Sequence, residues 1–128
     1  MTKLKAKSIN FDFPNQGGAE LFKVIGESDS IEAYVEFFDG NIDVKVRFEK
    51  VFGYRALDDS DLFDWWNFIS LKDGWCFHVE AGGWKQLEET RSDFMSAANE
   101  QLKEFLVISN NMCLSVLSYD YPIVSKDT

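Results

Sequence analysis

The residues best suited to catalysis in this 128-residue chain surround its one histidine, His78. Cys76, His78 and Glu80 alternate along an apolar run, so a β-strand would place all three on one face. A nucleophile, a base and a carboxylate in a row are the parts of a catalytic triad. Same-face neighbours on one strand lie about 7 Å apart, however, which exceeds the hydrogen-bond reach that a nucleophile and its base need. The row therefore favours a half-buried histidine at a sheet surface.

Ligands for a metal ion or a phosphate are poorly arranged. The chain has one histidine and two distant cysteines, Cys76 and Cys113, so the spacing typical of a zinc site is missing. The run Asp58–Asp64 is rich in carboxylates but lacks the glycine and the terminal glutamate of a calcium loop. Gly82 and Gly83 lack the frame of a phosphate-binding loop. We expect no metal, no cofactor and two buried free thiols.

Acidic residues dominate the charge, with 22 Asp+Glu against 13 Lys+Arg and a net charge of −9. Residues 20–39 hold six acids and one lysine, and residues 58–64 hold four aspartates and no cation. Nucleic-acid binding needs clustered basic residues, so this composition argues against it. Uneven negative potential instead accelerates encounter with a basic protein. The same acidity also serves solubility, and both interpretations stay open.

The chain has four tryptophans, Trp65, Trp66, Trp75 and Trp84, of which the first two directly follow the second acidic cluster. Adjacent residues on a helix are about 100° apart around its axis, so at least one of this pair can face outward. Aromatic side chains in acidic surroundings are typical of interface hot spots. Core packing is the alternative for each of them.

The clearest element that could position these residues is a hairpin. Ile42–Phe48 alternates apolar and charged residues, which indicates a half-buried antiparallel strand. Ile31–Phe38 alternates in the same way, and Asp39-Gly40-Asn41 supplies the tight turn between them. We predict a further strand over Leu21–Gly26, and an alternating stretch over Ile9–Phe13 that Pro14 cuts short.

A second hairpin is predicted from Glu104–Ser109 and Met112–Ser118 around Asn110-Asn111, because asparagine tolerates the left-handed turn conformation. Apolar residues on both faces favour central positions for these strands. Trp75–Val79 is predicted as another strand.

Two segments have helical spacing. Leu62, Trp65, Trp66 and Ile69 share one helical face, and the preceding aspartates suit an N-cap. From Trp84 to Ala98 the spacing is approximately helical, and Ser92-Asp93 is the point at which this segment would alternatively divide into two shorter pieces. The predicted fold class is therefore α+β: a single domain over residues 1–128, with a mainly antiparallel sheet of five to seven strands and one or two helices. We expect residues 1–8 to be a flexible N-terminal segment.

The first residues include lysines but no apolar stretch of the kind a signal peptide has. No run approaches the roughly 20 apolar residues that a membrane span needs. The expected location is the cytoplasm, without membrane contact.

In type, the chain resembles the immunity proteins of polymorphic toxin and contact-dependent growth inhibition systems. The likeness rests on the hairpin through Asp39-Gly40, the segment Val51–Arg55 with its acidic run and Trp65-Trp66, the Gly82-Gly83-Trp84 turn, and the closing hairpin followed by Pro122. Together these features extend over most of the chain.

The resemblance implies binding to a cognate toxin domain, often a basic nuclease, with acidic side chains in place of nucleic-acid phosphates. The residues implied in partner binding are Asp58, Asp59, Asp61, Asp64, Trp65, Trp66, Glu32 and Glu36. In this interpretation the aspartates steer the toxin, a tryptophan anchors it, and Glu32 and Glu36 form a second patch. A structural or adaptor domain is an alternative function, and so is a ligand binder or enzyme with a pocket near His78.

Overall fold

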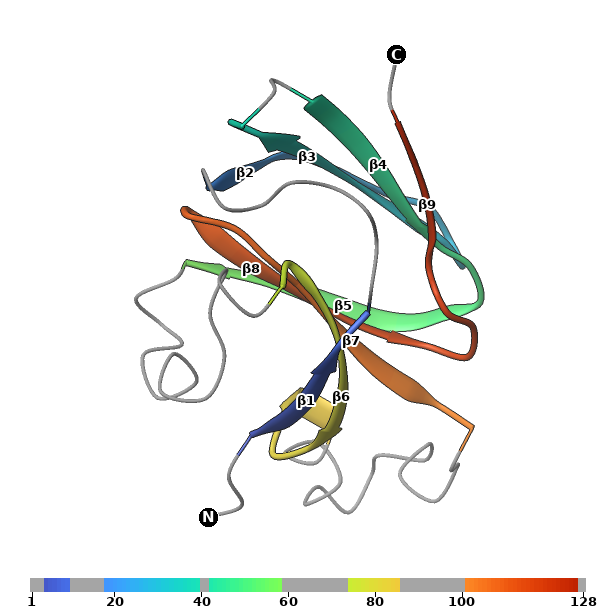
Figure 1. The fold of residues 1–128 in the computed structure, drawn as a ribbon. Coiled ribbons are helices and arrows are strands. Elements are labelled where there is room, and N and C mark those ends of the chain that lie inside the picture. Colours follow the sequence, from blue (N-terminus) through green and yellow to red (C-terminus); the bar gives the residue numbers. More distant parts are fainter. Residues whose placement is uncertain (1–3, 10–17, 40–41, 59–73, 86–100, 127–128) are drawn as a thin grey trace.

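The structure is a computed structural model, and it describes residues 4–9, 18–39, 42–58, 74–85 and 101–126. In these residues the chain forms nine β-strands (Figure 1). Their bounds are β1 Lys5–Ser8, β2 Ala19–Gly26, β3 Ile31–Phe37, β4 Ile42–Phe48, β5 Val51–Asp58, β6 Cys76–Ala81, β7 Lys103–Ile108, β8 Met112–Ser118 and β9 Ile123–Lys126.

The strands make two antiparallel sheets, one above the other in Figure 1. The five-stranded sheet has the order β1-β6-β7-β8-β5, and the four-stranded sheet has the order β2-β3-β4-β9. One cluster of buried side chains joins them, since Val35, Phe37 and Val46 from the four-stranded sheet pack with Phe105 and Val116 from the other. The fold is therefore a β-sandwich with its main core between the sheets.

The α+β prediction is wrong for the described residues, in which every element is a strand. The predicted single sheet is instead two sheets, because the chain crosses between layers after β1, β4 and β8. The predicted helix over Leu62–Ile69 lies outside the described residues. Of the second predicted helix only Trp84 and Lys85 are described, and their backbone is helical.

Alternation is the reason that the first hairpin forms as predicted. Ile31, Ala33, Val35 and Phe37 of β3 are fully buried, and Glu32 and Glu36 between them point to the opposite face. Strand β4 has the predicted bounds and pairs with β3 from Ile31↔Phe48 to Phe37↔Ile42. The hairpin thus gives the four-stranded sheet one apolar and one polar face.

Three strands were not predicted. Lys5–Ser8, expected to be flexible, forms β1 and pairs with β6 along the sheet edge. Val51–Asp58 forms β5, although Gly53 and Arg55 interrupt its apolar pattern. Ile123–Lys126 forms β9, which pairs with the distant strand β4. Each is an edge strand, and an edge strand carries a weaker hydrophobic pattern than a central one.

The turn Asn110-Asn111 joins β7 and β8 as predicted, but for a different reason. Neither asparagine has the positive φ that the prediction assumed. Their side chains instead hold strand β2: Asn110 Oδ1 accepts the Ala19 N–H at 2.7 Å, and the Asn111 amide bonds both the N–H and the C=O of Leu21. The turn therefore ties the two sheets together.

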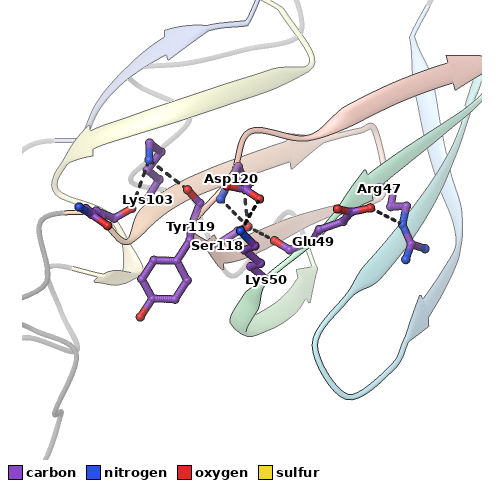
Figure 2. Close-up of polar contacts among 8 residues, drawn as sticks. Arg47, Glu49, Lys50, Lys103, Ser118, Tyr119 and Asp120 are labelled. Atoms are coloured by element: carbon purple, nitrogen blue, oxygen red, sulfur yellow. Dashed lines mark hydrogen bonds and ion pairs between the residues drawn. The ribbon is translucent and has the colours of Figure 1, made fainter.

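The two crossovers from β4 to β5 and from β8 to β9 lie side by side (Figure 2). Ser118 connects them, because its hydroxyl donates to the Glu49 carbonyl oxygen at 2.6 Å and accepts the Asp120 N–H at 3.3 Å. Lys50, at φ 53°, pairs with Asp120 across 3.8 Å. On the same side, Lys103 Nζ donates to the Tyr119 carbonyl oxygen at 3.1 Å.

Candidate protein-binding face

The polar face of the four-stranded sheet, which we call the outer face, carries charged and aromatic side chains. Strand pairing places them in cross-strand rows. Its members from β2, β3 and β4 are Glu20, Phe22, Lys23, Ile25, Glu32, Tyr34, Glu36, Asp43, Lys45 and Arg47.

The first row, which we call the acid row, consists of three carboxylates. Glu20 pairs with Glu36, and Glu36 pairs with Asp43, on three neighbouring strands. Opposite residues on one face have Cβ atoms about 5 Å apart, so the three charges repel one another. Within the described residues, no lysine or arginine makes an ion pair with any of the three. The acid row is thus a concentrated source of negative potential on a flat sheet surface.

The second row places aromatic side chains beside the acid row. The β2–β3 register shifts between Leu21 and Lys23, and Phe22 lies at this bulge. Its ring is 6.2 Å from that of Tyr34, and Lys23 Nζ lies 4.7 Å above the Tyr34 ring. Phe22 nevertheless stays 47% exposed. Exposed aromatic side chains are enriched at protein-binding surfaces, and the acid row beside Phe22 would add attraction for a basic partner.

In the third row the carboxylate is paired with cations. Glu32 lies 3.6 Å from Lys45 Nζ and 3.4 Å from an Arg47 nitrogen, and its side chain is 18% exposed. Arg47 also bonds Glu49, as Figure 2 shows. The structure therefore separates the two predicted glutamates: Glu36 belongs to the acid row, whereas Glu32 is engaged in ion pairs.

Of the remaining predicted binding residues, the structure describes the backbone of Asp58 alone. Asp58 ends β5 in the five-stranded sheet, and its side chain is not described. The rest lie outside the described residues: Asp59, Asp61, Asp64, Trp65 and Trp66. Sequence reasoning missed Glu20, Asp43 and Phe22. Aligning the first hairpin about its turn would have placed Asp43 opposite Glu36. The bulge in β2 shifts the register there, so the positions of Glu20 and Phe22 relative to β3 could not be predicted in the same way.

A matched pair of variants measures the repulsion in the acid row. We expect Glu36→Gln to raise the free energy of unfolding by about 0.2–1 kcal/mol, because it removes the middle charge of three. Glu32→Gln, on the same face of the same strand, should instead lower it by up to about 1 kcal/mol by breaking two partly exposed ion pairs. Urea denaturation at low and high salt measures both. Equal effects of the two substitutions would contradict the unequal environments described above.

The surroundings of His78 do not assemble a nucleophile. Cys76 is fully buried, and burial raises the pKa of its thiol far above the ordinary range. Glu80 pairs with Lys7 at 3.5 Å and Lys5 at 3.8 Å on the neighbouring strand β1. The His78 ring instead packs against aromatic rings, with Nδ1 3.3 Å from the Tyr121 hydroxyl. Cys76 is thus held as a neutral core thiol.

Burial is the main cause that lowers the pKa of His78. The charge of Glu80 raises this pKa, and the charges of Lys103 and Lys7 lower it further. The unfolded chain therefore takes up a proton near pH 6.5, whereas the folded chain does so only at lower pH. We expect stability to fall as the pH drops below 6.5 towards the folded pKa. A proton NMR titration is unambiguous because the chain has one histidine, and its midpoint should lie below 6.5.

A control is needed because Glu104 acts in the opposite sense. Burial raises the pKa of Glu104, although the backbone hydrogen bonds from Lys85 and Trp84 lower it in part. The contribution of Glu104 to stability therefore increases as the pH falls. The variant His78→Gln should abolish only the histidine contribution. If the His78→Gln variant lost stability below pH 6.5 as the parent does, His78 would not be the group that causes this loss.

Comparison with family models, with curated proteins and with solved structures finds no match for this chain. Among the described residues, no three His, Cys, Asp or Glu side chains gather as a metal ion would require. In the same residues, no helix is long and apolar enough to cross a membrane.

Proposed function

We propose that this protein is an acidic protein-binding module that holds a basic partner domain against the outer face. The observation that carries the proposal is the acid row next to the exposed ring of Phe22. Directly opposed like charges cost stability. A basic partner would remove that cost by pairing with the carboxylates, and its apolar side chains would cover Phe22.

The partner class that best fits this surface is the toxin domain bound by an immunity protein. A nuclease toxin carries lysines and arginines that contact phosphates, and carboxylates in a row can pair with the same groups. The net charge of −9 extends the attraction beyond the contact surface. Supporting evidence is the resemblance in type, together with the carboxylates of the outer face.

The test uses a toxin domain encoded beside the gene for this protein. Co-expression should protect cells from that domain, and stopped-flow measurements should show fast association that slows with added salt. The double variant Glu36→Gln/Asp43→Asn should slow association by about tenfold and weaken its salt dependence. The lack of a toxin gene beside this one, or failure to bind its product, would overturn the proposal.

A matched control separates the acid row from net charge. The double variant Glu49→Gln/Glu80→Gln removes the same charge from sites away from the acid row, where both glutamates pair with cations. It should change the association rate by much less than Glu36→Gln/Asp43→Asn does. Equal effects of the two double variants would show that net charge, and not the outer face, guides binding.

A further inference from the structure

The sign of the charge changes between two neighbouring rows of the outer face. Beside the acid row, Tyr34 pairs with Lys23 of β2 on one side and with Lys45 of β4 on the other, and we call these three residues the lysine row. The acid row and the lysine row cross β2, β3 and β4 in the same order. On β3 they are two residues apart, which is about 7 Å. The outer face thus carries a negative strip directly beside a positive one.

Both lysines of this row are able to bind a further carboxylate. Within the described residues Lys23 makes no ion pair, and its exposed side chain lies over the Tyr34 ring. Lys45 lies 3.6 Å from Glu32, a carboxylate that it shares with Arg47. A partly exposed pair of this kind contributes little stability, so Lys45 can take a second partner at little cost. The lysine row, like the acid row, is therefore not strongly paired within its own copy.

The outer face as a whole is nearly neutral. Its residues from β2, β3 and β4 include four acids and three cations, a net charge of −1, whereas the whole chain carries −9. Apolar side chains are exposed on the same face, because Ile25 pairs with Glu32 and Ile123 pairs with Arg47. At 0.15 M salt the Debye length is about 8 Å, so charges farther apart on two copies are largely screened. The net charge of the chain therefore does not prevent this face from meeting a copy of itself.

Symmetry restricts how two copies of the face can meet. In a twofold dimer both copies use the same face, and packed sheets keep their strand directions nearly aligned. A twofold axis along the strands would place acid row against acid row, where like charges repel. An axis across the strands, between the two rows, places the acid row of each copy against the lysine row of the other. Charge therefore selects the second arrangement.

The second arrangement also matches the two rows residue by residue. Because both rows cross the strands in the same order, each residue of the acid row faces the lysine-row residue of the same strand in the other copy. The three opposed pairs are Glu20 with Lys23, Asp43 with Lys45, and Glu36 with Tyr34. Two of these pairs join opposite charges, and in the third a hydroxyl can donate to a carboxylate. The symmetry makes each pair occur twice.

We propose that the outer face binds a second copy of this protein, with a twofold axis between the acid row and the lysine row. The face spans four strands and about seven residues, roughly 20 by 23 Å. An interface of this size is at the low end for specific complexes, so the expected dissociation constant is on the order of micromolar. The dimer does not rest on the proposed function. It adds a regulation to it, because a basic partner has to displace the second copy from the acid row.

The test is analytical ultracentrifugation from about 1 μM to 1 mM protein at 0.15 M salt. The parent should form a dimer. The variants Glu20→Lys/Asp43→Lys and Lys23→Glu/Lys45→Glu should each dimerise at least tenfold more weakly, because each places like charges opposite one another in both halves of the interface. An equimolar mixture of the two variants should form a heterodimer, since every reversed charge then faces an opposite one. Recovery in the mixture also shows that both variants are folded.

The matched control is Glu27→Lys/Asp29→Lys, which changes the net charge as Glu20→Lys/Asp43→Lys does. It lies in the exposed turn at the far end of the β2–β3 hairpin. It should dimerise within about threefold of the parent. A parent that stays monomeric throughout the range, a reversed variant that dimerises like the parent, or a mixture that stays monomeric would each overturn the proposal. None of these results bears on the toxin test, because that test measures binding to a different protein.

Discussion

Replacing Gly83 by alanine is expected to lower the free energy of unfolding by about 2–4 kcal/mol. A Cβ on Gly83 would lie 2.5 Å from Oε2 and 2.8 Å from Oε1 of Glu104. This carboxylate is buried, and it accepts the Trp84 N–H at 2.9 Å and the Lys85 N–H at 2.7 Å. It cannot withdraw without giving up both bonds, and a buried carboxylate without partners is costly.

A double-mutant cycle in urea isolates this contact. In a Glu104→Ala background the new methyl group has room, so we expect the Gly83→Ala substitution to cost less than about 1 kcal/mol there. Gly53→Ala is the matched control, because its Cβ would meet the Trp84 ring at an ordinary 3.6 Å. Additive costs in the cycle would show that Gly83 is needed for some reason other than its contact with Glu104.

Replacing Ser118 by alanine is expected to cost about 1–3 kcal/mol, since buried groups would lose their partners. Ser118 is fully buried, and its hydroxyl bonds the Glu49 carbonyl oxygen and the Asp120 N–H. Both crossovers depend on it, so hydrogen exchange should accelerate in β5 and β9 together. Thermal or urea denaturation and amide exchange measure the two effects.

The control for this substitution is Ser125→Ala on the exposed side of β9, which should change stability by less than about 0.5 kcal/mol. A Ser118→Ala variant as stable as the parent would contradict the role of this hydroxyl. Faster exchange in β9 alone would show that the two crossovers are held independently.

The first hairpin was predictable because a single physical pattern determines it. The alternation over Ile31–Phe37 and Ile42–Phe48 assigns one face of each strand to the core, and the structure buries that face. The thiols were predictable for a similar reason: Cys76 and Cys113 stand in apolar strands and are both buried and free. Burial raises the pKa of Cys113 to about 12.

The number of sheets was not predictable from these local patterns. The apolar patterns of β3 and β8 are the same whether the strands share a sheet or face each other across a core. What separates them is a set of distant contacts, such as those between Asn111 and Leu21 or between Ser118 and Glu49. Strands β1 and β9 are short and lie at edges, so their pairing depends on partners far along the chain.

The candidate binding face was predictable only in part. Glu32 and Glu36 lie on the outer face, where alternation put them. Their different environments depend on register, because Lys45 and Arg47 reach Glu32 while Glu36 stands between Glu20 and Asp43. No periodicity in a single strand contains that information.

The pairing of β9 with β4 has a consequence for how the protein is made. Val44 pairs with Lys126, so the four-stranded sheet cannot be completed until β9 has emerged from the ribosome. The hairpin of β3 and β4 is local in sequence and can form early, but one edge of β4 then waits through the synthesis of β5 to β8. The charged residues of β4, which are Asp43, Lys45 and Arg47, would oppose aggregation through this open edge until β9 pairs with it.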